Sequence, residues 1–199
     1  MGGERFNQLV GFIVGDGFCY KKKSRKNYLV GFIQSSKKAN ILEYYKNLLS
    51  TIFNKKPIVE KAPHGVIKVY IYSKDAYNLF REIKENPAEY LRRLPQEEKM
   101  KFFGGFIDAE GMVRRDRIIL YNADKDLILE IQELLKAYGV KSTIHFHHGV
   151  YELHIWERKS REIVASICKD YSVKLSSLFL PVDLSPKSPA PPEKGCLRS

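Results

Sequence analysis

The sequence predicts an α/β protein of the α+β type, made of two similar halves that each run helix, strand, strand, helix, strand, strand, helix. Three observations support this fold class. A nine-residue motif occurs twice, 94 positions apart, at residues 9–17 and 103–111. Two further segment pairs repeat in the same order at offsets of 88 and 84, which indicates an internal duplication. The 199 residues, 44% of them hydrophobic, are enough to bury a core.

The two motifs predict a pair of helices in close contact. They read Leu-Val-Gly-Phe-Ile-Val-Gly-Asp-Gly and Phe-Gly-Gly-Phe-Ile-Asp-Ala-Glu-Gly. Glycine inside a helix costs about 1 kcal/mol relative to alanine, so helices that keep it are expected to need close backbone contact. Packing the small-residue faces together would bring Asp16 and Glu110 side by side at the two C-termini. The small residues that share each face are Gly11 with Gly15, and Gly105 with Ala109.

Paired carboxylates at neighbouring helix C-termini are unfavourable without a counter-ion. The like charges repel each other, and the negative end of each helix dipole adds to the repulsion. A divalent cation would relieve both penalties. The chain has a net charge of +11, of which residues 1–94 carry +10, and this surplus favours a polyanionic partner. These features together indicate metal-dependent phosphodiester chemistry.

The elements that follow the first motif are predicted from periodicity and turn residues. A basic turn at residues 21–27 closes the first hairpin, and His64 with Gly65 turns the second. Apolar side chains at helical spacing mark the segment between the hairpins. After the motif helix we expect strands at 18–23 and 28–34, a helix at 39–53, strands at 57–62 and 66–72, and a helix at 74–85.

The second half repeats this pattern after a short linker. Pro87 marks the linker, and Pro95 opens the second motif helix, in keeping with the preference of proline for the first helical position. We expect a hairpin at 112–121, a helix at 126–138, strands at 141–147 and 150–156, and a helix at 158–169. The predicted domains are an N-terminal half at 1–85, a linker at 86–94, a C-terminal half at 95–180 and a proline-rich tail at 181–199 without a catalytic role.

The two motifs resemble, position by position, the signature of the LAGLIDADG homing endonucleases. Two copies in one chain are similar to the monomeric branch of that family, in which one protein carries both halves of a pseudo-twofold enzyme. The resemblance covers roughly residues 5–180. It implies an intron-encoded monomer that cuts both strands of a long, asymmetric double-stranded DNA site by metal-dependent hydrolysis, leaves short 3′ overhangs and needs no obligate protein partner.

The resemblance also implies a metal site. Asp16 and Glu110 would each bind a divalent ion, expected to be Mg²⁺, together with the backbone carbonyls of Gly15 and Ala109. Mn²⁺ is expected to substitute for Mg²⁺, and Ca²⁺ to bind without efficient cleavage. The ions would activate a water molecule and stabilise the charge on the phosphate and the leaving oxygen. Asp108 is interpreted as structural, because Val14 occupies the matching position of the first motif.

Two polar residues occupy matching positions near the end of the second strand of each half. In the family this position orders solvent around the metals, which makes Gln34 and Asn122 catalytic candidates. The other interpretation is a polar group at a strand end that is satisfied locally. The family often places a lysine near the scissile phosphate, and the substitutes that this sequence offers are Lys37, Arg114 and Arg115.

DNA contact is expected from the open faces of the two sheets. Residues alternate between apolar and polar or aromatic along 66–72 and along 150–156, as in an antiparallel sheet with one covered face. Two such sheets around a pseudo-dyad would form a saddle over successive major-groove segments, where base edges are distinguishable. The predicted DNA-binding residues are Lys22, Arg25, Lys68, Tyr70, Tyr72, Arg114, Arg115, Arg117, Lys141, Glu152, His154 and Trp156.

Two other functions remain open at this point. One is an RNA maturase or a non-cleaving DNA-binding regulator on the same scaffold, although such proteins would be expected to lose one or both motif-ending acids. The other is an unrelated basic protein whose repeats form only a core. The odd number of three cysteines, the lack of an apolar run of membrane-spanning length and the lack of a signal peptide favour a cytoplasmic location. Association with the nucleoid, or an organelle if the host gene is organellar, is compatible with the same features.

Overall fold

The computed structural model describes residues 4–22 and 27–178, and both halves follow the predicted order of elements. The first half contains α1 (Phe6–Asp16), β1 (Gly17–Lys22), β2 (Asn27–Ser35), α2 (Ala39–Phe53), β3 (Ile58–Ala62), β4 (Val66–Tyr72) and α3 (Lys74–Glu85). The second half contains α5 (Gln96–Glu110), β5 (Gly111–Val113), β6 (Ile118–Asn122), α6 (Lys125–Ala137), β7 (Thr143–His147), β8 (Val150–Ile155) and α7 (Arg158–Cys168). The predicted α+β fold class is confirmed.

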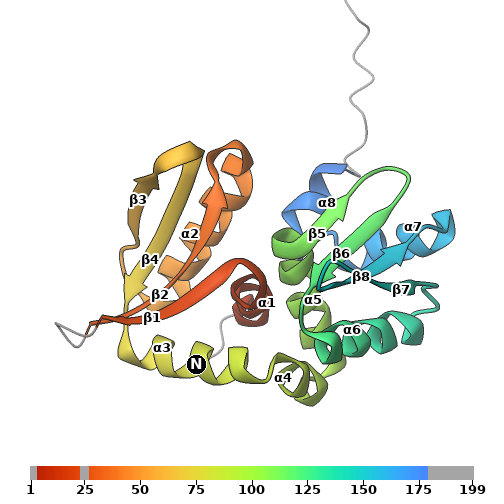
Figure 1. The fold of residues 1–199 in the computed structure, drawn as a ribbon, viewed down its shortest axis with the longest axis horizontal. Helices are drawn as coiled ribbons and strands as arrows, with labels where there is room; N and C mark the ends of the chain where they lie inside the picture. The colour runs from red at the N-terminus through yellow and green to blue at the C-terminus, as the bar shows by residue number, and fades with distance from the viewer. Residues whose placement is uncertain (1–3, 23–26, 179–199) are drawn as a thin grey trace, which may run out of the picture.

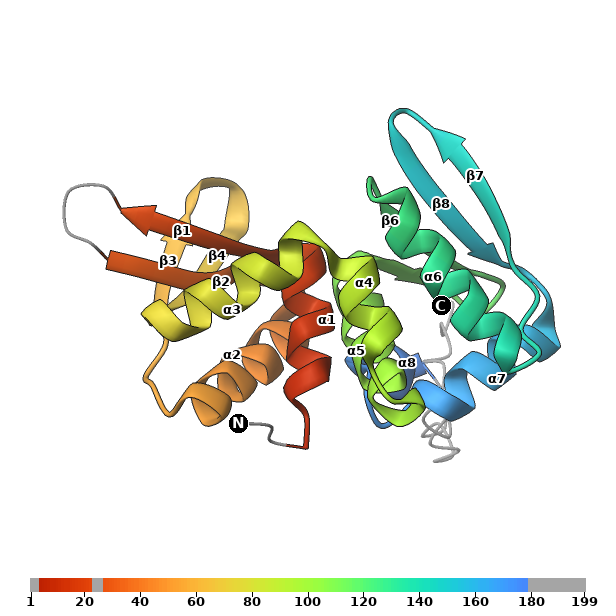
Figure 2. The ribbon, with the colours of Figure 1, turned by 90° about the horizontal axis from the view of Figure 1, so that it is seen from below.

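Each half has one four-stranded antiparallel sheet with the same topology. The strand orders are β1-β2-β4-β3 and β5-β6-β8-β7. Figure 1 shows one sheet on each side of the central helices α1 and α5. In the view of Figure 2, the sheets lie toward the upper edge, and helices α2 and α7 lie toward the lower edge. The outer hairpin of each half turns on a His-Gly pair with positive φ, 60° and 71° at His64 and Gly65 and 50° and 81° at His148 and Gly149.

The two motif helices pack against each other through glycine, as the sequence predicts. A Cβ atom on Gly11 would overlap the backbone carbonyl of Phe102. A Cβ atom on Gly105 would overlap the backbone carbonyl of Gln8, which stands 94 positions before Phe102. The contact is therefore reciprocal about a pseudo-twofold axis. Most apolar side chains of both helices are buried, and Phe12 and Phe106 are completely so.

The strand alternation separates a covered face from an open one. In the first sheet Val69 pairs with Phe32, and both are fully buried on the helix side. The next pair along the ladder, Lys68 with Ile33, lies on the opposite face, where Ile33 is 46% exposed. An antiparallel sheet that is covered on one side leaves the other side free for a ligand.

Two helices were not predicted. The linker predicted at residues 86–94 contains a helix, α4 (Pro87–Arg93), which joins the halves. Asn86 accepts a hydrogen bond from the backbone N–H of Glu89 and Pro87 stands in the first turn, so the segment has both an N-cap and a favourable first residue. The second unexpected helix, α8 (Val173–Leu178), follows α7.

The limits of several other elements also differ from the prediction. The hairpin expected at 112–121 consists of β5 and β6 separated by a turn, in which the N–H of Arg114 bonds the carbonyl of Arg117 at 2.9 Å. Strand β7 starts at Thr143 rather than at residue 141. Short 3-10 turns stand at Ser36–Lys38 and Pro63–Gly65. Within residues 4–22 and 27–178, no helix is both long and apolar enough to cross a lipid bilayer.

Candidate active site

Asp16 and Glu110 lie together at the C-terminal end of the motif-helix seam. Asp16 is the last residue of α1 and Glu110 the last residue of α5. A Cβ atom on Gly15 would lie 2.6 Å from Cβ of Ala109 and 2.8 Å from Cγ of Glu110. The absence of a side chain on Gly15 therefore allows the Glu110 side chain to lie over the end of α1. The seam brings the two carboxylates together as the motif spacing predicts.

Both carboxylates are half-buried, and their environment raises their pKa values. For Asp16 the main cause is loss of hydration, which outweighs the opposing effect of nearby Lys38, Lys174 and Lys84. For Glu110 the main cause is again loss of hydration, and the negative charge of Asp16 raises its pKa further. The structure thus holds two carboxylates where their charges are unfavourable, which is common at functional sites.

Gln34 contacts one of the acids directly. Its Nε2 donates a hydrogen bond of 2.7 Å to Oδ2 of Asp16, and its Oε1 accepts one of 3.0 Å from the backbone N–H of Ser35. Gln34 is itself buried, because it stands on the helix side of β2. Asn122 makes a local bond instead, accepting from the backbone N–H of Asp124 at 2.8 Å. The matching sequence positions therefore have different partners in the two halves.

Three lysines around the acids were not identified from the sequence. Lys38, at the start of α2, and the half-buried Lys84 and Lys174 all lower the pKa of Asp16 and of Glu110 by their positive charge. One signal for Lys84 existed, because it stands four residues after the buried Phe80 on the inner face of α3. A lysine in an apolar helix stripe is unusual and indicates a buried partner.

The two half-buried lysines bind the ends of the motif helices. Lys84 Nζ donates to the carbonyl oxygens of Ile13 and Val14 at 3.0 Å each and of Gly17 at 2.9 Å. Lys174 Nζ donates to the carbonyl oxygens of Ile107 at 3.0 Å and Gly111 at 2.6 Å. The carbonyls of Ile13 and Ile107 already accept the backbone N–H groups of Gly17 and Gly111, so the ammonium groups add a second, charged donor at the last turn of each helix.

Asp108 holds α8 in place, in agreement with its interpretation as structural. It is fully buried, and burial raises its pKa. Its carboxylate accepts from the Tyr45 hydroxyl at 2.8 Å, the Ser172 hydroxyl at 2.7 Å, and the backbone N–H groups of Val173 at 2.8 Å and Lys174 at 2.9 Å. Asp108 therefore joins α2 of the first half to the start of α8.

The donor set at the seam fits a hard divalent cation. Two carboxylates converge beside the last helical turns that hold the carbonyls of Gly15 and Ala109, and Mg²⁺ prefers such oxygen ligands and keeps several waters. Within the part of the chain that the structure describes, no group of three or more His, Cys, Asp or Glu side chains gathers. The remaining ligands would therefore be backbone carbonyls, water and substrate oxygens.

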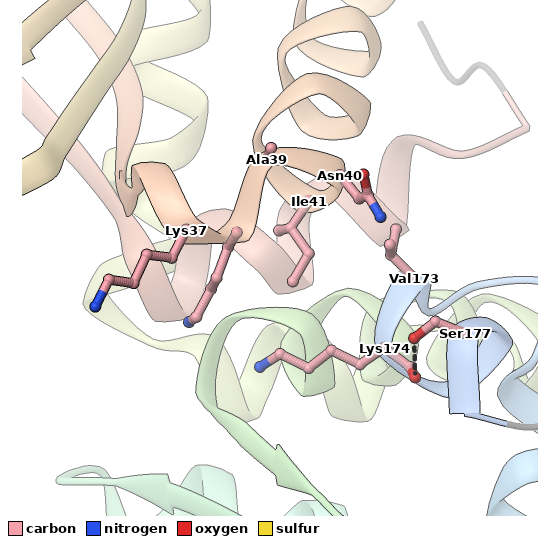
Figure 3. A pocket seen from close by; sticks show the side chains of 8 residues that line it. Lys37, Ala39, Asn40, Ile41, Val173, Lys174 and Ser177 are labelled. Carbon is pink, nitrogen blue, oxygen red and sulfur yellow. Dashed lines mark hydrogen bonds between the residues drawn. The ribbon is translucent and has the colours of Figure 1, made fainter. Parts of the chain in front are cut away.

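A pocket lined by both basic and apolar side chains opens between the halves beside this site. Its volume is about 240 Å³, and it is lined by Lys37 and Lys38 from the first half and by Val173, Lys174 and Ser177 from the second. Figure 3 shows the side chains of Lys37 and Lys174 extending from opposite halves of the molecule, with Lys174 coming from α8. Lys37, one of the substitutes for the family lysine, thus lines the same pocket as Lys38 and Lys174, whereas Arg114 and Arg115 lie in the exposed β5–β6 turn.

The open face of the first sheet carries a basic and aromatic cluster. Lys68 Nζ lies 4.8 Å from the ring centre of Phe18 and 5.2 Å from that of Tyr70. Tyr70 donates to Glu60 at 2.6 Å, and it is 5% exposed because its neighbours cover it, whereas Tyr72 is 41% exposed. The side chain of Lys22 and the whole of Arg25, both predicted to bind DNA, lie outside the described residues.

The open face of the second sheet carries an aromatic and histidine cluster. His154 stacks on Trp156 with ring centres 5.2 Å apart and bonds Glu152 at 2.8 Å. Arg117 lies over the Trp156 ring at 5.1 Å. Lys141 is exposed at the rim and pairs with Glu157 at 3.3 Å. Glu152, His154 and Trp156, which the sequence predicts to bind DNA, thus lie on the same open face of the second sheet.

Comparison with known proteins identifies relatives of this chain. Residues 97–169 match the family model described as a LAGLIDADG-like domain. The homing endonuclease I-DmoI of Desulfurococcus mucosus is 30% identical over 172 residues, which cover 82% of this chain and 87% of that protein. The chain also matches glutamine–fructose-6-phosphate aminotransferase of Methanocaldococcus jannaschii at 25% identity, but it spans only 17% of that protein.

Solved structures show the same fold. The crystal structure of I-DmoI in complex with DNA and Ca has a TM-score of 0.70 and 26% identity, and the match covers 86% of this chain and 95% of that one. The complex of I-DmoI with DNA and Mn has a TM-score of 0.66 and 27% identity, covering 81% and 94%. The homing endonuclease I-WcaI bound to its DNA recognition sequence, at 16% identity and a TM-score of 0.62 with 88% and 85% covered, agrees in fold.

Proposed function

This chain belongs to the LAGLIDADG family of homing endonucleases, and we propose that it cuts both strands of a long, asymmetric DNA site and leaves short 3′ overhangs. It is a site-specific DNA endonuclease. The observation that carries the proposal is the meeting of Asp16 and Glu110 at the ends of two packed helices, between two sheets that each have an open polar face. Each half supplies one acid, which agrees with a reaction in which each acid serves the cut in one DNA strand.

The residues of the seam have distinct roles in this reaction. Asp16 and Glu110, with the carbonyls of Gly15 and Ala109, would hold the divalent ions, which activate water and neutralise the charge on the phosphate and the leaving oxygen. Gln34 orients the Asp16 carboxylate through its 2.7 Å hydrogen bond. Lys38 adds positive charge beside both acids and can attract the DNA backbone.

The reaction depends on a divalent metal, and we propose that Mg²⁺ is the natural ion. The oxygen donors at the seam are those that Mg²⁺ prefers. Mn²⁺ should substitute because it accepts the same ligands. Ca²⁺ is larger and takes more ligands in a looser geometry, so it should support binding with little or no cleavage.

Recognition of the target is proposed to use the open sheet faces. Lys68 and Tyr72 on the first sheet, with Glu152 and Trp156 on the second, present donors, acceptors and rings of the kinds that read base edges in the major groove. Tyr70 and His154 lie on the same faces but are nearly buried by these neighbours. Arg117 and Lys141 stand beside the second cluster. The 18 basic residues of the first 94 make that half the stronger source of phosphate attraction.

The test starts from a randomised DNA library, since the target sequence must be found first. Wild-type protein is incubated with the library in Mg²⁺ and in chelator, and the cleaved ends are sequenced. We expect a single long site, cut in both strands only with Mg²⁺. The matched control is the double variant Asp16→Asn, Glu110→Gln, which keeps the shapes of the side chains and removes both charges.

The control separates cleavage from binding. The double variant should bind the selected site and leave it intact. Cleavage by this variant at the wild-type rate would contradict the assignment of the acids. Sequence-specific binding by the wild-type protein without any cut in Mg²⁺ or Mn²⁺ would instead favour a non-cleaving regulator, and preference for structured RNA would favour a maturase.

A further inference from the structure

The two motif helices end in the same way, each on a lysine ammonium group. The acceptors that the two contacts share are the carbonyls of Ile13 and Gly17 in the first motif and those of the residues 94 positions later in the second. The donors are not duplicated in the same manner. Lys84 belongs to α3, whereas Lys174 belongs to α8, which comes after α7, the counterpart of α3. Two different elements therefore supply one and the same contact.

Placing the two ammonium groups at the helix ends costs hydration free energy. Partial burial lowers the pKa of Lys84 and lowers that of Lys174 to about 8, so both ammonium groups are held where their charge is poorly hydrated. Nearby carboxylates oppose this effect: Asp16 and Glu110 raise the pKa of both lysines, and Asp108 raises that of Lys174. Lys38 acts in the other direction on Lys174 by repulsion. The surrounding carbonyl oxygens and carboxylates stabilise the two ammonium groups in this poorly hydrated position.

The position of the contact links it to the acids. The acceptor carbonyls Ile13 and Gly17 stand on either side of Gly15 and Asp16, so fixing them fixes the turn between them. The same holds in α5, where Ile107 also accepts the N–H of Gly111. A helix end that is bound on its last carbonyls frays less than a free one.

We propose that Lys84 and Lys174 are positioning residues, each of which fixes the helix end of one strand-cleaving site. Lys84 orders the end of α1 that carries Asp16, and Lys174 orders the end of α5 that carries Glu110. Neither lysine has to touch the DNA for this role. The inference rests on the proposed function, in which each acid serves the cut in one strand.

The role predicts effects that are specific to one strand. Asp16→Asn and Glu110→Gln first show which strand each acid serves. Lys84→Met should then slow the cut that Asp16→Asn abolishes, and Lys174→Met the cut that Glu110→Gln abolishes. The expected loss is about 10–100-fold, the range seen when groups that hold metal ligands are removed. The other strand should be cut at nearly the wild-type rate, so nicked DNA accumulates with opposite strand bias in the two variants.

A second measurement needs neither metal nor DNA. Hydrogen–deuterium exchange of the metal-free protein should speed up at residues 13–18 in Lys84→Met and at residues 107–112 in Lys174→Met, without a change at the other helix end. The control variants are Lys46→Met and Lys136→Met, whose lysines each pair with a glutamate three residues earlier on α2 and α6 and do not contact the ends of α1 and α5. Both controls should match the wild type in strand ratio and in exchange.

The outcomes distinguish this inference from the proposed function. Equal loss of both cuts, in proportion to the folded fraction, would overturn the positioning role while leaving the nuclease assignment intact. Absence of cleavage by the wild-type protein would reject the proposed function, whereas the exchange experiment would still report on the helix ends. If a Met variant does not fold, Lys84→Gln and Lys174→Gln take its place, because glutamine is uncharged and one bond shorter than lysine and should not reach the same carbonyls. An unchanged strand ratio with unchanged exchange in them counts against the inference.

Discussion

Gln34 donates its Nε2 hydrogen to Oδ2 of Asp16 at 2.7 Å, while Asn122, at the matching position of the second half, bonds the backbone N–H of Asp124. The two halves are thus duplicated in fold but differ in how the acids are supported. The Gln34 side chain spans from its strand to the end of the neighbouring motif helix, whereas the Asn122 side chain turns to its own strand end.

This asymmetry predicts unequal effects of two matched substitutions. Gln34→Leu removes a direct partner of Asp16 and should slow one strand cut by about 10–100-fold. Asn122→Leu removes a local turn contact and should change either cut much less. Single-turnover cleavage of DNA labelled on each strand measures both rates. Equal slowing by the two variants would show that Asn122 also serves the site.

The acids should make the metal-free protein less stable as the pH rises. The pKa values of Asp16 and Glu110 are raised in the folded state above their ordinary values of 3.8 and 4.5. The folded state therefore binds protons more readily than the unfolded state, and stability falls as the pH increases through the raised pKa values. Urea denaturation in chelator across this range measures the slope. The double variant Asp16→Asn, Glu110→Gln should flatten it and stabilise the protein at neutral pH.

The glycine seam should not tolerate a side chain. Gly11→Leu or Gly105→Leu would force a side chain into the backbone of Phe102 or of Gln8. Overpacking of this kind typically costs about 1–3 kcal/mol, and contact with backbone leaves little room to adjust. The free energy of unfolding, measured with denaturant, and the cleavage rate should fall together, because the same contact sets the spacing of the acids. Leu129→Ala, at a 40% exposed position on α6, is the control that should change neither.

Lys68 should contribute to phosphate attraction from the first sheet. Replacing it by alanine is expected to reduce the salt dependence of DNA binding by up to about 0.9 in the slope of log affinity against log salt, the value for one phosphate contact. If Lys68 reads a base edge instead, its loss changes base preference at one position and leaves the slope nearly unchanged. Titrations at several salt concentrations, with Lys46→Ala as the control on the covered side, separate these outcomes.

Asp108→Asn should destabilise the protein through α8. The carboxylate accepts four hydrogen bonds, and an amide has only one acceptor atom, so donors are left without partners. Each buried donor without an acceptor costs about 1–3 kcal/mol. The cut that depends on Glu110 should be affected more than the other, because α8 carries Lys174. Tyr45→Phe, which removes one donor and leaves the carboxylate, should be milder in both stability and strand bias.

Much of the fold could be predicted from the sequence because its signals are local or repeated. The motifs specify both central helices and their glycine contact, and strand alternation specifies the open faces. Helix α4 was missed although its signal was present, since Asn86 followed by Pro87 is a favourable helix start. Helix α8 could not be found in this way, because the acceptor that caps it, Asp108, is more than 60 residues away in the sequence.

The acids of the site followed from the motifs, but their neighbours did not. Helical spacing marks Lys84 as a lysine on an apolar face, and Lys174 looks like an ordinary charged residue, but only tertiary packing brings either of them to the carbonyls of α1 and α5. Lys38 likewise reaches the acids because α2 starts beside the end of α1. Charge alone could not distinguish these three lysines from the other basic residues of the chain.

The reciprocal seam also bears on how the protein responds to a break in its chain. Gly11 and Gly105 lie in a face that each half buries against the other, so a half on its own would expose a bare apolar helix to water. A protease that cuts within α4 would therefore release no independent domain. The two fragments would remain associated as a nicked molecule and unfold together, as expected of one cooperative unit.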